Sequence, residues 1–345
     1  MRTFVLTMAT LLAIPAFAQE DERYEERLDV DIVLVDATVT NRRGEQILGL
    51  DKEDFTITED GIAQEIDSVE YFTNRRLLDQ PESQAPFKVA RTDEPRYFVL
   101  FFDKAQVEGI SLRNTLWRAS REAKKFVRKE LAEGDLVAVA AHGPRLEMFS
   151  DFTSDRAQLD KALDAAVRFG HGIDLESEND AGLISALDPE RVMSRTGRIY
   201  DALGTLGEAL QTIRGRKVLV LFTPGFGEGT GFGTMARSDE QWYEPMVRAL
   251  NEANTSVYGI NLLENISYSP LEQQITRLAS ETGGEYFRSP VSFLTPLREI
   301  ENENNGYYLI TYRSSKPKGE HGYQKVDVAL RNPEFEVKAR DGYIY

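Results

Sequence analysis

The sequence contains no cysteine among its 345 residues, so we expect no disulfide framework and no lipid attached to an N-terminal cysteine. Histidine is almost as scarce: His142, His171 and His321 are far apart, and each precedes a glycine, which is typical of a turn residue rather than a ligand. The sequence also lacks the His-Glu-x-x-His, Gly-x-Ser-x-Gly and Gly-x4-Gly-Lys-Ser/Thr patterns of zinc proteases, serine hydrolases and P-loop proteins. We therefore expect a protein that is not an enzyme.

Positive charge is also in short supply. The chain has 41 Lys and Arg against 57 Asp and Glu, which gives a formal net charge of −16 at pH 7. Phosphate binding requires clustered positive charge, so this composition argues against nucleic acid as a partner. The same excess of carboxylates argues against electrostatic adsorption to anionic lipid. High solubility is the simplest consequence of this acidity.

Hydrophobic runs long enough to cross a membrane are missing as well. The segment from Phe4 to Ile14 is mostly apolar but too short for a span. It follows Arg2 and precedes Ala16-Phe17-Ala18, a small-x-small motif typical of a signal-peptide cleavage site. We expect residues 1–18 to be a signal peptide that is cleaved near Ala18. The mature protein is then exported, either to the periplasm or as a secreted protein, and has no integral membrane segment.

The clearest structural signal is the segment from Arg96 to Gln106, in which six consecutive apolar residues, Tyr97 to Phe102, end at Asp103. A continuous apolar run predicts a strand that is buried on both faces, as in the centre of a parallel sheet. Open α/β sheets bind their ligands at the carboxyl ends of the strands, so Asp103 lies at a candidate site. Apolar residues spaced by three to five positions follow from Leu112 to Leu131 and predict a helix.

The alternation of strand and helix continues along the chain. Buried strands are predicted at 135–141, 217–223 and 256–262, with a short antiparallel strand at 146–149 and a last short strand at 285–287. Helices are predicted after Asp155, at 199–213, at 242–253 and before Gly283. This alternation predicts an α/β fold with a doubly wound, mostly parallel sheet that is covered on both faces. Residues 169–194 have little periodicity and are predicted to form a long loop.

Both ends of the chain have a β pattern instead. Short alternating runs occupy residues 28–73 and return in residues 305–345. Residues 74–94, which include Pro81 and Pro86, are predicted to be a linker. A small sheet is marginally stable alone, so we expect the two ends to complete one small β-sandwich that flanks an α/β domain of residues 95–304.

These segments carry a family resemblance. The middle of the chain resembles the von Willebrand factor type A (VWA) domain, a Rossmann-like fold whose first hydrophobic strand ends in Asp; here Thr223-Pro224-Gly225 stands where the family usually has Thr-Asp-Gly. The head, from Val35 to Gly61, and the tail, from Tyr307 to Tyr343, are similar to an exported VWA-related subgroup typical of acidobacterial genomes. The resemblance covers nearly the whole mature chain and implies a protein-binding module.

The resemblance also implies an ion site, from which this sequence departs. The family pattern is Asp-x-Ser-x-Ser on a first loop, Thr on a second and Asp on a third. Asp103 and Thr196 match the first and second loops, but Ala105 and Val107 stand at the serine positions and Pro224 at the third-loop aspartate. Mg²⁺ prefers about six oxygen ligands. We therefore expect a degenerate, vestigial site with no metal and no cofactor, and weak Mg²⁺ binding is the alternative.

The function expected from these observations is an exported, non-enzymatic module that recognises an unidentified protein partner through the loops at the strand C-termini. The candidate binding residues are Asp103, Gln106, Thr196, Thr223, Gly225 and Gly227. Two alternatives stay open. One is an adhesion-type VWA domain that depends on Mg²⁺ or Ca²⁺. The other is a hydrolase with a carboxylate base, which would need Asp103 within hydrogen-bond reach of His142 in a deep pocket.

Overall fold

The computed structural model describes residues 32–73, 89–91, 95–105, 109–132, 134–169, 182–227, 236–263, 271–288, 291–314 and 323–344. The chain divides into residues 1–30 and residues 31–345, and every described residue belongs to the second unit. The predictions for the signal peptide and for Gln106 fall outside the described residues. Across the ranges given above, no helix combines the length and the apolar character needed to cross a bilayer.

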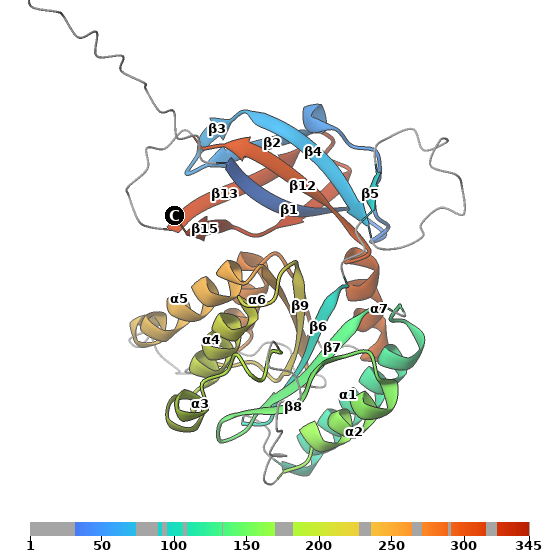
Figure 1. The fold of residues 1–345 in the computed structure, drawn as a ribbon, viewed down its shortest axis with the longest axis vertical. Helices are drawn as coiled ribbons and strands as arrows, with labels where there is room; N and C mark the ends of the chain where they lie inside the picture. The colour runs from blue at the N-terminus through green and yellow to red at the C-terminus, as the bar shows by residue number, and fades with distance from the viewer. Residues whose placement is uncertain are drawn as a thin grey trace, which may run out of the picture. The chain divides into compact units, whose positions relative to one another are not determined.

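A six-stranded sheet forms the centre of the fold (Figure 1). Its order is β11-β10-β9-β6-β7-β8, with β6 (Tyr97–Asp103), β7 (Leu136–His142), β8 (Leu146–Thr153), β9 (Lys217–Thr223), β10 (Thr255–Asn261) and β11 (Tyr286–Phe287). Neighbouring strands are parallel, except that β8 pairs antiparallel with β7. The predicted α/β class, with a mostly parallel sheet, is confirmed.

Helices cover both faces of this sheet (Figure 1). They are α1 (Gly109–Lys129), α2 (Arg156–Ala166), α3 (Pro189–Arg195), α4 (Ile199–Leu210), α5 (Ala236–Glu252), α6 (Glu272–Glu281) and α7 (Leu294–Glu303). Successive side chains of β6 point to opposite faces. Phe98 and Leu100 enter the core shared with α1, α2 and α7, whereas Val99 and Phe101 enter the core shared with α4, α5 and α6. This burial on both sides accounts for the continuous apolar run of β6.

The head and the tail of the chain build two further sheets. One has the order β14-β1-β12-β4-β5 and the other the order β15-β13-β2-β3. Their strands are β1 (Ile32–Asn41), β2 (Phe55–Glu59), β3 (Ile62–Gln64), β4 (Ile66–Thr73), β5 (Val89–Arg91), β12 (Gly306–Arg313), β13 (Tyr323–Leu330), β14 (Phe335–Ala339) and β15 (Gly342–Ile344), and a short 3-10 helix (Lys52–Asp54) precedes β2. Head strand β1 lies between tail strands β12 and β14, and β2 pairs with tail strand β13. Head and tail therefore share one set of sheets and one hydrophobic core, as predicted.

Three elements differ from the sequence prediction. The predicted linker contains β5, which pairs in parallel with β4. Helix α3 begins inside the predicted loop of residues 169–194 and ends one residue beyond it, because Asp188 caps its N-terminus and Pro189 occupies its first turn. Helix α7 was not predicted either, although Leu297 and Ile300 on its buried side have a helical spacing of three.

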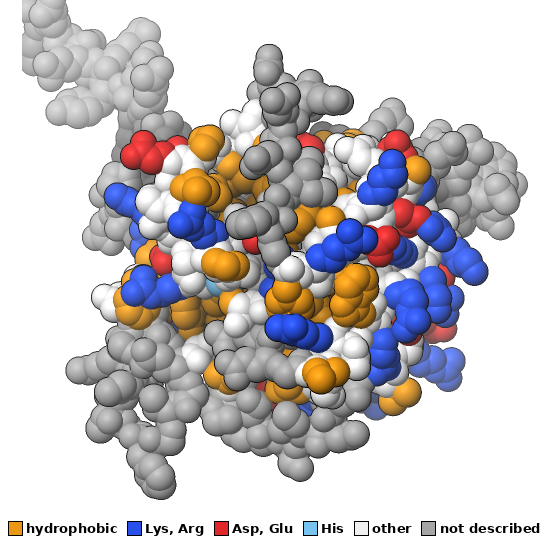
Figure 2. All heavy atoms as spheres, turned by 90° about the horizontal axis from the view of Figure 1, so that it is seen from below, with side chains coloured by type: hydrophobic (Ala, Val, Ile, Leu, Met, Phe, Trp, Pro, Cys, Tyr) orange, Lys and Arg blue, Asp and Glu red, His pale blue; other side chains and the backbone are white. Residues whose placement is uncertain are grey.

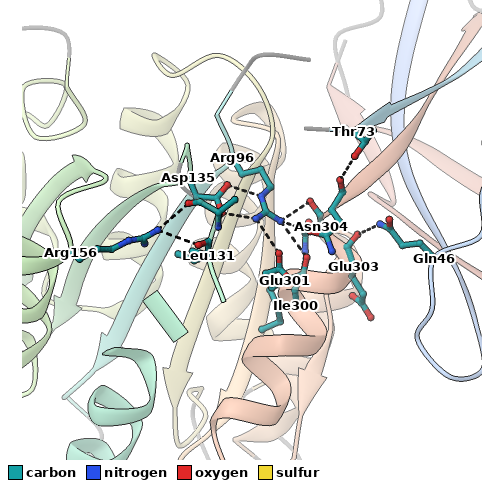
Figure 3. A network of polar contacts seen from close by, with 12 residues as sticks. Gln46, Thr73, Arg96, Leu131, Asp135, Arg156, Ile300, Glu301, Glu303 and Asn304 are labelled. Carbon is teal, nitrogen blue, oxygen red and sulfur yellow. Dashed lines mark hydrogen bonds and ion pairs between the residues drawn. The ribbon is translucent and has the colours of Figure 1, made fainter. Parts of the chain in front are cut away.

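Arg96, one residue before β6, fixes the N-terminal end of the central sheet (Figure 3). Its guanidinium donates to the two carboxylate oxygens of Asp135, at 2.8 and 2.5 Å, and to Asn305 Oδ1 at 2.8 Å. Burial lowers the pKa of Arg96, but the hydrogen bonds and charges of Asp135 and Glu301 raise it overall. The buried charge is therefore fully partnered, as a stable buried ion requires.

Two head residues extend this network toward the tail (Figure 3). Gln46 Nε2 donates to the backbone carbonyls of Glu303 and Gly306 at 2.9 and 2.8 Å, and Thr73 Oγ1 donates to the Asn305 carbonyl at 2.9 Å. These bonds satisfy carbonyls where α7 ends and β12 begins. Structural contacts thus occupy the N-terminal end of the central sheet, and the candidate site lies at the opposite, carboxyl end.

Candidate functional site

The carboxyl ends of β6, β7 and β9 bring three polar side chains together. Asp103 ends β6, His142 ends β7 and Thr223 ends β9. In the sheet register Asp103 is paired with His142, and Phe102 is paired with Phe222, the residue before Thr223. Parallel neighbours in register end at the same edge of a sheet, so the strand pairing alone places these side chains next to one another.

The Asp103 carboxylate is fully buried, with 0 % of the residue exposed. Thr223 Oγ1 donates to its Oδ2 at 2.8 Å, and the Ala105 backbone N–H donates to its Oδ1 at 3.2 Å. The Gly225 N–H in turn donates to Thr223 Oγ1 at 3.0 Å. A buried carboxylate is stable only when it accepts such bonds. Asp103 thereby joins the loop after β6 to the loop after β9.

His142 connects the same strand ends to a loop more than fifty residues away in the chain. Its Nε2 lies 3.2 Å from the Thr196 carbonyl oxygen, which can only accept, so Nε2 carries the proton. Its Nδ1 lies 3.7 Å from Asp103 Oδ1, which is beyond hydrogen-bond distance. This buried Nδ1 has no hydrogen-bond partner in the described part of the chain. The prediction of a turn residue is wrong for His142: it is the last residue of β7, and Gly143 begins the turn.

Thr196 anchors the second loop at the C-cap of α3. Its hydroxyl donates to the Val192 carbonyl at 2.7 Å and accepts the Leu146 N–H at 3.0 Å. A donor and an acceptor function of this hydroxyl are therefore already used within the protein. Thr196 makes no direct bond to Asp103. Its carbonyl accepts from His142, whose ring lies against Asp103.

The third loop depends on glycine at position 225. Gly225 has a φ of 100°, in the left-handed region, and a Cβ there would lie 2.6 Å from the Leu271 carbonyl oxygen. The Phe226 N–H donates to that same carbonyl at 3.2 Å, so this loop packs against the residue that precedes α6. Gly227 also has a positive φ, of 118°. The predicted site glycines thus shape the backbone, and the rest of the glycine-rich loop, 228–235, lies outside the described residues.

The sequence reasoning missed Lys104, whose side chain is buried beside the site. Its Nζ donates to Glu147 Oε2 at 2.5 Å and to the Arg168 carbonyl at 3.3 Å, and it lies 5.2 Å from the centre of the Phe149 ring. The ion pair joins the loop after β6 to β8 and to the end of α2. A lysine after a strand-ending aspartate gives no sequence signal of burial, because Lys is mostly an exposed residue.

A second buried carboxylate lies at the same edge, at the end of β10. Glu272 accepts a hydrogen bond from Asn261 Nδ2 at 3.0 Å and forms an ion pair with Arg288 at 2.6 Å. Burial, followed by the charge of Glu272, raises the pKa of Tyr286. Asn261, Glu272 and Arg288 were not among the predicted site residues, because they come from separate elements and form no local motif.

The side-chain oxygens at this edge are a poor donor set for a magnesium ion. Both carboxylate oxygens of Asp103 and the Thr196 hydroxyl are already engaged, and Ala105 and Pro224 have no side-chain oxygen. Within the ranges that the structure describes, no group of three or more His, Asp or Glu side chains is arranged to hold a metal ion. Mg²⁺ prefers about six oxygens in an octahedral array.

Neither a protein-family model nor a curated protein matches the sequence. Solved structures similar to this chain include a von Willebrand factor type A protein from Catenulispora acidiphila, with 11% identity, coverage of 90% of this chain and 71% of that chain, and a TM-score of 0.41. Two others are the conserved hypothetical protein BatB from Bacteroides thetaiotaomicron (15% identity, 60% and 96% coverage, TM-score 0.38) and an aerotolerance-related membrane protein from Bacteroides fragilis (14% identity, 60% and 98% coverage, TM-score 0.39). At these scores the matches decide neither activity nor partner. The fold assignment rests on the sheet order itself.

Proposed function

We propose that this chain is an exported, non-enzymatic VWA-type module that binds another protein without a metal ion. Two observations support the proposal. First, the motifs of the head, middle and tail resemble exported VWA-related proteins. Second, the loops after β6 and β9 and the α3–α4 loop lie together at the carboxyl edge of the central sheet. The proposed binding face consists of these loops and includes Asp103, Gln106, Thr196, Thr223, Gly225 and Gly227.

The contacts that connect the three loops carry the metal-free part of the proposal. Thr223 donates to Asp103, and His142 donates to Thr196 while it lies against Asp103. In a metal-dependent domain of this type, the resemblance implies that an ion connects the corresponding loops. Here the Thr223 hydroxyl bonds the third loop directly to Asp103, and the His142 imidazole, which donates to the second loop, packs against Asp103. An entering ion would have to break the 2.8 Å bond between Thr223 and Asp103, and each such lost bond leaves a buried group that costs about 1–3 kcal/mol.

The geometry does not favour the hydrolase alternative. His142 Nδ1 and Asp103 Oδ1 are 3.7 Å apart, so the pair lacks the base–orienter hydrogen bond that such chemistry requires. The two residues are 2 % and 0 % exposed, so neither side chain presents a reactive atom to a substrate. The Mg²⁺ or Ca²⁺ alternative requires side-chain oxygens at positions 105, 107 and 224, where the sequence has Ala, Val and Pro.

A single added side chain can test the binding face. Gly197 is exposed beside Thr196, and a Cβ there would approach only the Pro144 carbonyl, at 4.0 Å. Gly134 is an exposed control position between α1 and β7, at the opposite end of the strands, with no atom within 4 Å of an added Cβ. An added Cβ meets no close contact at either site.

The experiment is capture of a partner by the immobilised mature protein from an envelope extract of the source organism. We expect the parent protein and Gly134→Arg to retain the same partner in EDTA and in Mg²⁺, and Gly197→Arg to lose it. Capture that requires Mg²⁺ contradicts the metal-free mechanism. Capture that survives Gly197→Arg places the binding surface elsewhere on the protein.

A further inference from the structure

We propose that the exposed side of α1 is a second docking surface and that it binds a carboxylate-rich segment of a partner protein. We call this surface the α1 basic stripe, and it consists of Arg113, Trp117, Arg121, Lys125 and Lys129. These residues recur at every fourth position, and all five are exposed. The stripe is separate from the loops proposed above and does not depend on that proposal.

The geometry of α1 fixes the stripe in place. Residues four apart are neighbours on a helix surface. Each such step advances about 40° beyond a full turn, so the sixteen positions from the first to the last member rise about 24 Å and wind about 160° around the axis. The opposite side of α1 is buried in the core through Leu116, Ala119, Ala123 and Phe126. The helix therefore cannot rotate, and the stripe faces solvent as a ridge that winds across the exposed half of α1. Figure 2 shows Lys and Arg side chains gathered on the side of the molecule where α1 and α2 lie.

The charge of α1 is opposite to that of the whole chain. The helix contains seven Lys or Arg residues and one Glu, whereas the complete chain has a net charge of −16. Two of its cations, Lys124 and Arg128, form ion pairs with Asp164 and Asp160 of α2. Its single acid, Glu122, accepts hydrogen bonds from the α7 entry rather than from the stripe. Among the residues that the structure describes, the neighbouring elements thus leave the charge of the stripe uncompensated.

Most of this positive charge does not serve the stability of the helix, and only Lys129, in the last turn, is favourably placed relative to the helix dipole. Arg121, Lys125 and Lys129 have no ion-pair partner among the residues whose positions are described. They form two like-charge pairs at spacing i,i+4, each of which destabilises a helix by about 0.2–0.5 kcal/mol. Opposite charges at these positions would favour folding. The pattern therefore points to binding.

Apolar groups lie within the same surface. Trp117 is 42 % exposed between Arg113 and Arg121, and Ile110, two turns earlier on the same side, is 80 % exposed. The Arg113 guanidinium is held over the Phe169 ring at 4.4 Å from its centre. Trp and Arg are the residue types that most often dominate protein–protein binding energies. Covering Trp117 would exclude water from the adjacent ion pairs and strengthen them.

The shape of the stripe and the charge of the whole chain together favour an acidic protein segment. An extended chain spans about 3.3–3.6 Å per residue, so a short peptide can follow the whole stripe. Charges farther away than the Debye length of about 8 Å are largely screened at physiological salt. An anionic membrane or a long nucleic acid extends well beyond the stripe and would meet the carboxylates that give the chain its charge of −16.

The test uses a fluorescein-labelled peptide of ten glutamates as the probe and the full mature chain as the receptor, with fluorescence anisotropy as the readout. We expect binding that weakens as salt is raised, and a loss of affinity of about tenfold or more in the double variant Arg121→Glu/Lys125→Glu. The matched control is Arg43→Glu/Arg248→Glu, which makes the same change in net charge at two exposed positions outside α1. We expect this control to bind within about twofold of the parent.

A second readout reports on the stripe itself. The chain has only two tryptophans, so Trp242→Phe leaves Trp117 as the sole source of tryptophan emission, and we expect that emission to shift to the blue when the peptide binds. Circular dichroism verifies that each variant is folded. If Arg121→Glu/Lys125→Glu does not fold, Arg121→Gln/Lys125→Gln takes its place. The proposal would be overturned if the peptide shows no salt-dependent binding, or if the control variant loses as much affinity as the stripe variant. It would also be overturned if phosphatidylglycerol vesicles, or an oligonucleotide of equal charge, bind more tightly than the peptide.

Discussion

The Thr223 hydroxyl supplies one of the two hydrogen bonds of a fully buried carboxylate. Thr223→Val preserves the shape of the side chain but leaves Asp103 Oδ2 without its 2.8 Å donor. An unsatisfied buried acceptor costs about 1–3 kcal/mol, so we expect the free energy of unfolding to fall by about 2 kcal/mol. Thr223→Ser keeps the hydroxyl and should retain most of the stability. Urea denaturation compares the three proteins, and a change below about 0.5 kcal/mol for Thr223→Val would contradict this role.

Asp341 provides a residue-level test that depends on pH. Burial, followed by the charge of Glu281, raises the pKa of Asp341 from 3.8 to about 6. Between these values the folded state holds a proton that the unfolded state releases. The resulting stabilisation is complete below about pH 4 and is lost as the pH rises to about 6.

The matched variant is Asp341→Asn, which has no titrating group. We expect it to be more stable than the parent at pH 7, and we expect the difference to shrink as the pH falls toward 4. Denaturation curves at four pH values between these limits give the measurement. A difference that stays constant across this range would show that the Asp341 carboxyl does not titrate in this way.

Local sequence could locate Asp103 but could not reveal its bonds. The apolar run before it predicted the end of a central strand, and Ala105 and Pro224 indicated a departure from a typical ion site. The bond to Thr223 links residues that are 120 positions apart. The contacts of His142 likewise depend on the register of β6 with β7 and on the path of the α3–α4 loop. No spacing rule reports contacts over such separations.

At the scale of elements, long amphipathic segments and buried strands were predictable, whereas short capped pieces were not. Helix α3 has only seven residues, so its hydrophobic period is too short to detect, although Asp188-Pro189 is a helix-start signal. Strand β5 has three residues and depends on its neighbour β4 for its conformation. Elements of this length are fixed by tertiary contacts rather than by intrinsic propensity.

The turn between α6 and β11 gives a prediction at this scale. A Cβ on Gly284 would lie 2.0 Å from the Val257 carbonyl oxygen, which is backbone of the buried strand β10. Gly284→Ala must therefore displace β10 or β11, and we expect it to destabilise the fold by about 2–3 kcal/mol. Gly134→Ala, where nothing lies within 4 Å of the added Cβ, is the control and should change stability by less than about 0.5 kcal/mol. Equal stability of the two variants would contradict this packing.

At the scale of the whole molecule, the pattern at the two chain ends was sufficient to predict a shared β module. A head of short strands with a weakly covered face needs partners, and the tail has the same alternation. The strand order was not predictable, because β1 lies between β12 and β14 and this order follows from long-range pairing. The hydrophobic core of the module likewise combines head and tail residues, such as Val35 and Tyr308.

This shared module predicts the result of truncation. Deleting residues 306–345 removes both neighbours of β1 and the tail partner of β2. We expect the head to become accessible to protease and the truncated protein to aggregate, because the core of the module is exposed. Deleting only residues 342–345 removes the edge strand β15 and should leave the head protected. A protected head in the larger truncation would mean that the two β segments fold independently.

The most direct test of the account is thermal denaturation of the mature protein with and without Mg²⁺ or Mn²⁺. An ion that binds only the folded state at a hundredfold excess over its Kd adds about 2.7 kcal/mol to stability, which would raise the Tm visibly. With Ala105, Val107 and Pro224 at the ligand positions, we expect no shift in millimolar ion and no effect of EDTA. We expect the triple variant Ala105→Ser/Val107→Ser/Pro224→Asp to gain the response. A clear rise of the Tm in the parent that Asp103→Ala abolishes would contradict the metal-free binding face.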